Sequence, residues 1–264
     1  MKIFCCMLLL VPFAAAQNNS PAAVPAQTSP AAQTSPAPQT VTLPPTPQQI
    51  SHMEQMLQDW PDLERYRAAN AALPPPAPGE KRVVFMGDSI TDAWGNPTGV
   101  FFPGEPYINR GISGQTTPQM LIRFWHDVIA LQPKVVVILA GTNDIAGNTG
   151  PSTPAMIQDN LMAMADLAKA NGIRVVLASI LPAAAYPWKP GIDPRAEIVA
   201  LNDWMRKTCA REGYVYLDYY SAMVNPEQGM KKELTIDGVH PNAAGYAVMT
   251  PLAEQAIAEA LKAQ

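Results

Sequence analysis

Short apolar runs alternate with longer amphipathic stretches along the C-terminal part of the chain. The runs are rich in β-branched residues and predict strands at residues 82–86, 107–109, 134–140, 173–180 and 214–218. Helical spacing lies between them, at residues 117–131, 153–171, 194–213 and 242–263. The run at 134–140 has no polar alternation, as expected of a central strand covered on both faces. Such alternation predicts a three-layer α/β/α sandwich around a five-stranded parallel sheet.

Composition divides the chain ahead of this domain, which we place at residues 80–264, into three segments. Residues 1–16 have the features of a secretory signal peptide, with Lys2 before an apolar stretch and small residues at its end. Residues 17–47 are mostly Pro, Ala, Gln, Thr and Ser, which predicts a disordered linker. Residues 48–79 combine helical spacing with a proline-rich connector. We call residues 48–79 the N-terminal lead and expect it to pack against the domain.

Composition and charge narrow the class of protein. The chain has 264 residues, 48% of them hydrophobic, and a formal charge of −4 without a basic cluster, which argues against a nucleic-acid partner. The N-terminal apolar stretch is short for a membrane span, so we expect a secreted or periplasmic protein with no span once the signal is removed. Signal removal leaves Cys209 as the only cysteine, and hence no internal disulfide. Neither metal-ligand spacing nor a nucleotide-binding turn is present, so no cofactor is expected.

Residues able to carry chemistry follow the predicted strands. Gly87, Asp88 and Ser89 close the first run, Gly114 follows the second, and residues 141–144 (Gly-Thr-Asn-Asp) follow the third. Ligand sites of open α/β sheets lie at the carboxyl ends of the strands, so these residues are expected to gather there. A serine hydroxyl becomes a useful nucleophile when a base takes its proton and donors receive the oxyanion. The pattern therefore predicts an acyl-transfer site.

The three histidines allow the base to be chosen by elimination. His52 lies in the N-terminal lead, outside the domain. His126 lies in a predicted helix among apolar residues, where we expect a structural side chain. His240 remains, in a loop just ahead of the last helix. Asp237, three residues earlier, is within reach of its imidazole, although Asp237 before Gly238 is also typical of a turn.

These blocks, in this order and strand context, resemble those of the SGNH (GDSL-type) hydrolases over about residues 82–260. A Gly-x-Ser-x-Gly elbow is missing, so the layout is not that of the α/β-hydrolases. The resemblance implies a flavodoxin-like SGNH fold and a serine esterase that works through an acyl-enzyme. The chain looks most similar to the branch of platelet-activating-factor acetylhydrolases and bacterial carbohydrate esterases, which implies removal of a short acyl group, acetyl first, from a carbohydrate or other small ester.

The resemblance also implies a role for each residue of the site. Ser89 would be the nucleophile, His240 the general base and Asp237 the group that orients the imidazole. The oxyanion would be received by the backbone N–H groups of Ser89 and Gly114 and by the side-chain amide of Asn143. Taken singly, Ser89 is also a good helix cap, and Gly114 and Asn143 are also ordinary loop residues. No metal is implied.

Several neighbours and functions remain open from sequence alone. We expect Asp88 and Asp144 to bond backbone amides, and Arg110 to lie near the pocket as a cation for a polar or anionic substrate. Tyr186 and Trp188 either form a wall for an acyl or sugar group or pack within a proline-rich loop. Alternative activities are a lysophospholipase or thioesterase on longer chains and an O-acyltransferase. The alternative without catalysis is a tethered glycan-binding domain.

Overall fold

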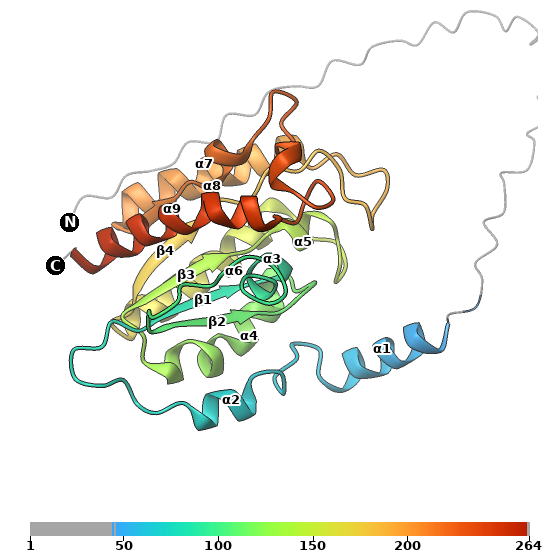
Figure 1. The fold of residues 1–264 in the computed structure, drawn as a ribbon. Helices are drawn as coiled ribbons and strands as arrows, with labels where there is room; N and C mark the ends of the chain where they lie inside the picture. The colour runs from blue at the N-terminus through green and yellow to red at the C-terminus, as the bar shows by residue number, and fades with distance from the viewer. Residues whose placement is uncertain (1–43, 45, 263–264) are drawn as a thin grey trace, which may run out of the picture. The chain divides into compact units, whose positions relative to one another are not determined.

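The computed structural model describes residue 44 and residues 46–262 of the chain. The predicted signal peptide, and the predicted linker at residues 17–43 and 45, lie outside the described residues. The strands are β1 (Val83–Gly87), β2 (Tyr107–Gly111), β3 (Val135–Leu139), β4 (Arg174–Ala178) and β5 (Val215–Leu217). The helices are α1 (Pro47–Gln58), α2 (Arg67–Ala72), α3 (Ser89–Asp92), α4 (Thr117–Asp127), α5 (Thr142–Ile145), α6 (Pro154–Ala170), α7 (Arg195–Glu212), α8 (Tyr219–Met223) and α9 (Ala243–Lys262) (Figure 1).

Within the described residues, five parallel strands form one sheet in the order β2-β1-β3-β4-β5. The register places Phe85 of β1 between Asn109 of β2 and Val137 of β3. Strand β3 is central and fully buried, as its unbroken apolar run predicts. The predicted five-stranded parallel sheet is confirmed.

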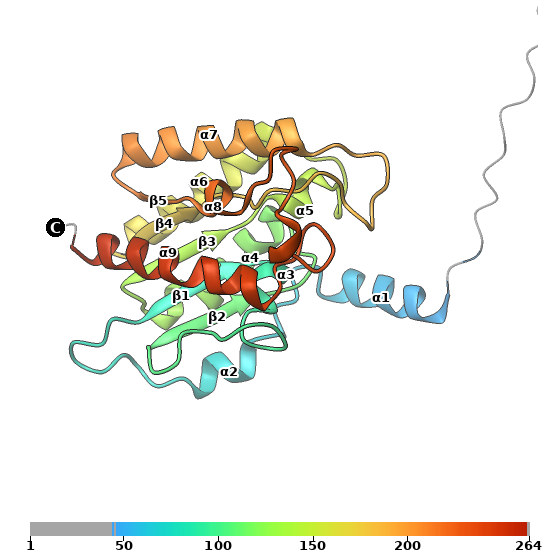
Figure 2. The same ribbon diagram turned by 45° about the horizontal axis from the view of Figure 1, so that its top comes forward.

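Helices cover both faces of this sheet. Alternate side chains of each strand point to opposite faces, so each strand contributes apolar residues to two separate cores. One face packs Val84 and Met86 of β1 against α4, α6 and α7. The other packs Val83 and Phe85 against α9, which lies across the strands in Figure 2. The predicted three-layer α/β/α architecture is confirmed.

Two very short helices, α3 and α5, lie where the site forms, outside the four long helical ranges predicted from the sequence. Helix α3 follows β1 and packs directly on the end of β2. A Cβ atom built on Gly111 would lie 2.1 Å from the backbone nitrogen of Asp92, so only glycine permits this approach. Helix α5 begins at Thr142, immediately after β3 and Gly141. Both helices therefore start at the carboxyl edge of the sheet.

Among its described side chains, the N-terminal lead contacts the domain in its second part, after α1. On α1, the side chains of Ile50, Met53 and Leu57 are exposed, contrary to the expected packing. Beyond α1, the Tyr66 hydroxyl donates a hydrogen bond to the carbonyl of Gly111. Residue Asn70, on α2, donates to the Asp127 carboxylate at 2.7 Å. The lead is thus fixed to the domain through polar contacts after α1.

Among the described residues, no helix combines the length and the apolarity that crossing a bilayer requires.

Candidate active site

Three predicted site residues from opposite ends of the domain meet in one hydrogen-bonded line. The hydroxyl oxygen of Ser89 lies 3.0 Å from His240 Nε2, although the two residues are 151 positions apart. His240 Nδ1 lies 2.8 Å from Asp237 Oδ2. This geometry lets the imidazole take the serine proton while the carboxylate orients the ring.

The loop that holds His240 is organised by Asp237. One oxygen of its carboxylate accepts the backbone N–H groups of Val239 at 3.0 Å and His240 at 2.8 Å. The Asp237 carboxylate therefore has both of the roles expected from the sequence, as a turn cap and as the partner of the imidazole. Partial burial raises the pKa of Asp237, but hydrogen bonds from His240 and Val239 outweigh it and leave that pKa below its ordinary value. Asp237 is therefore a carboxylate at neutral pH.

Two backbone donors at the site are unused. Within the described part of the chain, neither the Ser89 N–H nor the Gly114 N–H donates a hydrogen bond. Ser89 is the first residue of α3, where an N–H has no partner inside the helix. Gly114 adopts a positive φ of 81°, and a Cβ atom there would meet nothing within 4 Å. Open space beside a free N–H suits an oxyanion.

The third predicted donor, Asn143, is buried near the start of α5. Its Nδ2 donates to the carbonyl of Gln115 at 3.0 Å and approaches a carboxylate oxygen of Asp88 at 3.4 Å. Its side-chain oxygen accepts a hydrogen bond from Asn148 at 2.8 Å, which sets the orientation of the amide. One hydrogen of the Asn143 amide is therefore held by the Gln115 carbonyl, and the other only by the longer contact to Asp88. The second hydrogen is the one that the predicted role, donation to the oxyanion, requires.

The two flanking carboxylates bond backbone amides, as predicted. Asp88 caps α3 by accepting the Ile90 N–H at 3.0 Å. Asp144 accepts the Thr117 N–H at 3.0 Å and so holds the start of α4. Burial raises the pKa of Asp88 to about 7, although the Ile90 N–H and the nearby His240 act in the opposite direction. Asp88 is therefore a titrating group directly behind the serine.

Two expectations about basic residues are wrong. Arg110 is buried under the N-terminal lead, with its guanidinium 4.6 Å from the Tyr66 ring centre and its Nε donating to Asn70. It anchors the lead and takes no part in lining the cavity described below. His126 is exposed on α4, because the helix turns it away from the core that Phe124 enters. Phe124, two positions before it, lies on the opposite side of the helix.

The structure assigns different positions to Tyr186 and Trp188, the two aromatic residues whose roles the sequence left open. Tyr186 is buried, and its hydroxyl lies 3.0 Å from the hydroxyl of Thr142, so it belongs to the core. Trp188 is 40% exposed, with its ring centre 5.8 Å from that of His240. Its indole N–H donates to Asn148 at 3.0 Å. Trp188 is therefore a wall of the site.

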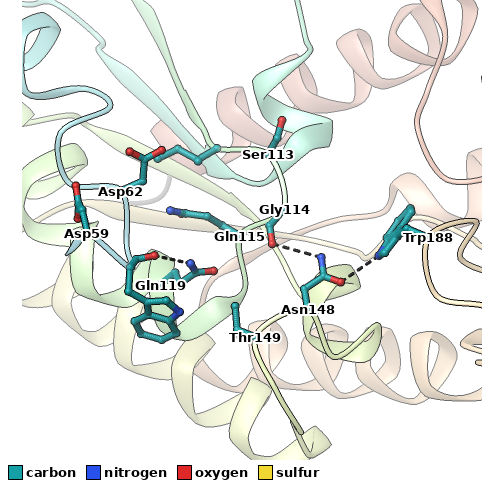
Figure 3. A pocket seen from close by; sticks show the side chains of 11 residues that line it. Asp59, Asp62, Ser113, Gly114, Gln115, Gln119, Asn148, Thr149 and Trp188 are labelled. Atoms are coloured by element: carbon teal, nitrogen blue, oxygen red, sulfur yellow. Dashed lines mark hydrogen bonds between the residues drawn. The ribbon is translucent and has the colours of Figure 1, made fainter. Parts of the chain in front are cut away.

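A cavity of about 320 Å³ lies beside this line of residues (Figure 3). Its walls are Asp59, Trp60, Asp62, Ile112, Ser113, Gly114, Gln115, Gln119, Asn148, Thr149 and Trp188. Ser89 and His240 lie outside this lining, so the cavity adjoins the reacting atoms without enclosing them. Figure 3 shows the hydrogen bonds that connect Gly114, Asn148 and Trp188 along one side.

Sequence reasoning missed the residues that complete this cavity. Asn148 connects separate loops, and Gln115 bonds the N-terminal lead, but neither belongs to a motif. Asp59, Trp60 and Asp62 precede the predicted domain altogether. In the described residues, no cluster of His, Cys, Asp and Glu is arranged to hold a metal ion.

Comparison with known proteins gives consistent matches. The model of the GDSL-like lipase/acylhydrolase family matches residues 85–248. Esterase TesA of Pseudomonas aeruginosa is 32% identical over 175 residues, 61% of this chain and 80% of that protein. An acetylxylan esterase of Xylanibacter ruminicola is 24% identical over 243 residues, 79% of this chain and 48% of that protein. The crystal structure of a GDSL-like lipase from Bacteroides thetaiotaomicron is 44% identical, with a TM-score of 0.74 over 76% of this chain and 99% of that one.

Proposed function

Since this chain belongs to the GDSL-like lipase/acylhydrolase family and hydrolyses ester bonds, we propose that it removes a short acyl group, acetyl first, from a carbohydrate or other small ester. The observation that carries the proposal is the hydrogen-bonded line from Ser89 through His240 to Asp237. In it, Ser89 is the nucleophile, His240 the general base and Asp237 the group that holds the ring.

Acylation begins when Ser89 Oγ attacks the ester carbonyl and its proton passes to His240 Nε2. The carbonyl oxygen becomes an oxyanion, which the N–H groups of Ser89 and Gly114 and the Asn143 amide receive. The bond to the alcohol oxygen then breaks, and His240 returns the proton to that oxygen. The products of this half are the free alcohol and an acyl ester on Ser89.

Deacylation repeats these steps with water. A water molecule gives its proton to His240 Nε2 while its oxygen attacks the acyl carbon, and the same donors hold the second oxyanion. The bond to Ser89 Oγ breaks, the proton returns to the serine, and the carboxylic acid leaves. Asp237 remains ionised throughout and stabilises the imidazolium formed in each half.

The cavity supports a small polar substrate. Its volume of about 320 Å³ lies at the small end of the range for ligand sites, and its walls combine two tryptophans with amide, hydroxyl and carboxylate groups. A site for a long acyl chain would need a long apolar groove instead. The similarity to an acetylxylan esterase points the same way.

Hydrolysis of 4-nitrophenyl esters from acetate to palmitate, by wild type and Ser89→Ala in parallel, tests the proposal. We expect activity that is highest with acetate or butyrate and that falls by at least about a thousandfold in the variant. The matched control is Ser221→Ala, which removes an exposed hydroxyl on α8 and should leave the activity unchanged.

The other outcomes distinguish the alternatives. Activity that rises toward palmitate would show that the enzyme prefers a long, lipid-type acyl chain to a short one. Formation of an acylated sugar when a glycan acceptor is added would show that an alcohol competes with water for the acyl-enzyme. Absence of any Ser89-dependent turnover would reject the esterase mechanism for this site and favour the glycan-binding alternative.

We also propose that the protein is exported. The support is in the sequence, where Lys2 precedes an apolar stretch that ends in Ala14, Ala15 and Ala16. Mass spectrometry of the protein recovered from its own host should find a mature N-terminus near Gln17. An intact Met1 in the cell interior would contradict the proposal.

A further inference from the structure

We propose that the N-terminal lead supplies a subsite for the alcohol part of the ester, in which Asp62 and Trp60 bind a neutral polyhydroxylated group such as a sugar residue. The inference rests on the proposed function, ester hydrolysis at Ser89. It adds residues that lie outside the region matched by the family model, residues 85–248. Asp59, Trp60 and Asp62 form the part of the cavity wall that comes from the lead.

Two glutamine side chains of the domain hold this part of the lead in place. Gln115 donates to the carbonyl of Pro61 at 2.7 Å, and Gln119 donates to the carbonyl of Trp60 at 2.6 Å. Both glutamines are buried. Because Gln115 directly follows Gly114, the lead is attached beside the predicted oxyanion donors (Figure 3).

A buried arginine fixes that attachment to the sheet. Arg123 is fully buried on α4, and its Nε donates to the side-chain oxygen of Gln115 at 2.6 Å. The same guanidinium donates to the carbonyl of Gly87 at 3.0 Å, two residues before Ser89. Its charge is paired with Asp127 at 3.0 Å. The wall and the nucleophile are therefore connected through one rigid side chain, which is the preorganisation that a binding subsite needs.

The turn at residues 59–62 leaves one carboxylate available. Asp59 is occupied, because its two oxygens accept the N–H groups of Leu63 at 2.9 Å and Glu64 at 3.0 Å. Asp62 has a φ of 55°, a left-handed conformation that aspartate tolerates better than most residues. Among the described residues, none donates a hydrogen bond or forms an ion pair to the Asp62 side chain. Partial burial, and then the charge of Asp59, raise the pKa of Asp62.

A half-buried carboxylate without donors is best satisfied by a ligand that brings hydroxyl groups. The indole rings of Trp60 and Trp188, which line the cavity, add apolar surface against which the C–H groups of a sugar ring can pack. The described residues that line the cavity include two aspartates and neither lysine nor arginine. The carboxylates of Asp59 and Asp62 repel phosphate or uronate groups, so the subsite fits a neutral glycan better than a phospholipid headgroup.

The test compares two substrates whose acyl group is the same and whose alcohol differs. Wild type, Asp62→Asn and Trp60→Ala are assayed on an acetylated xylo-oligosaccharide and on 4-nitrophenyl acetate. Asparagine keeps the shape of the side chain and tolerates the left-handed φ, so the turn is retained. Matched controls are Glu64→Gln, an exposed carboxylate two residues after Asp62, and Trp125→Ala, an exposed tryptophan on α4. Thermal unfolding of each variant reports on the fold.

We expect kcat/KM on the acetylated oligosaccharide to fall roughly tenfold or more in Asp62→Asn, as for loss of a hydrogen bond to a charged group, and by a similar factor in Trp60→Ala, as for loss of buried apolar contact. On 4-nitrophenyl acetate the same variants should stay within about twofold of wild type, and both controls should be unchanged on both substrates. Equal losses on the two substrates, or no loss on the oligosaccharide, would overturn the subsite while leaving the esterase intact. Wild type without Ser89-dependent turnover of either ester would instead reject the proposed function, and the subsite with it.

Discussion

The indole nitrogen of Trp188 lies 3.0 Å from the side-chain oxygen of Asn148, and this bond connects the loop after β4 to the predicted oxyanion donors. The Asn148 amide nitrogen contacts the side-chain oxygen of Asn143 at 2.8 Å and the carbonyl of Gly114 at 3.4 Å. One asparagine thereby fixes the orientation of the Asn143 amide and the position of Gly114. Trp188 in turn fixes that asparagine.

We therefore expect Trp188→Phe to lower kcat for 4-nitrophenyl acetate about threefold to tenfold. Phenylalanine keeps an aromatic wall beside His240 but cannot donate to Asn148, so the loss corresponds to roughly one hydrogen bond. Steady-state kinetics measure the effect, with Trp125→Phe as the exposed control. A kcat equal to that of wild type would show that the Trp188–Asn148 bond does not position the donors.

Replacing the donor itself has a larger expected effect. Asn143→Ala should lower kcat by about 10²–10³-fold with little change in KM, because its amide would act mainly on the charge that develops in the transition state. The matched control is Asn160→Ala, since Asn160 also donates a side-chain bond but to Thr117, on the start of α4. If kcat falls less than about tenfold, Asn143 is not a donor to the oxyanion.

Asp88 predicts a pH dependence of stability with a defined sign. Burial raises its pKa in the folded protein from 3.8 to about 7, so the folded state binds the proton more tightly than the unfolded state. The stability contributed by Asp88 is complete below about pH 4 and is lost as the pH rises toward about 7. Relative to Asp88→Asn, wild type should lose on the order of 1–3 kcal/mol in the free energy of unfolding between pH 5 and pH 8.

Urea unfolding of both proteins at several pH values measures this difference. Asp159→Asn, a change at an exposed carboxylate on α6, provides the comparison and should show no such pH dependence relative to wild type. A constant offset between wild type and Asp88→Asn from pH 5 to pH 8 would contradict the prediction.

The close approach of α3 to β2 predicts a steep cost for Gly111→Ala. The new Cβ atom would lie 2.1 Å from a backbone nitrogen, so α3 and Ser89 must move. We expect a loss of about 2–4 kcal/mol in the free energy of unfolding, together with a loss of esterase activity. Gly104→Ala, where the added atom meets nothing within 4 Å and only a positive φ of 85° is strained, should cost about 1–2 kcal/mol. Equal costs at the two positions would show that α3 adapts to the clash.

Much of the fold could be read from local patterns in the sequence. The unbroken apolar run of β3 and the alternation of strands with helices suffice for a parallel sheet covered on both faces, because each pattern reflects the burial of its own segment. The contact between Asp237 and His240 is also local, since three residues separate them. Ser89 and His240 are far apart in sequence, yet a general rule applies to them: the carboxyl edge of such a sheet collects the loops that carry chemistry.

Only tertiary packing determines which residues surround the hydrogen-bonded line of Ser89, His240 and Asp237. Arg110 lies beneath Tyr66, Gln115 holds Pro61, and Asn148 joins Gly114 to Trp188, and no local pattern encodes these partners. A side-chain hydrogen bond depends on which loops meet in space and at what distance, whereas a strand or helix depends mainly on the periodicity of its own residues. Local sequence patterns are therefore enough to predict the sheet, its layers and the candidate chemical groups, whereas the walls around those groups depend on which segments meet in the folded chain.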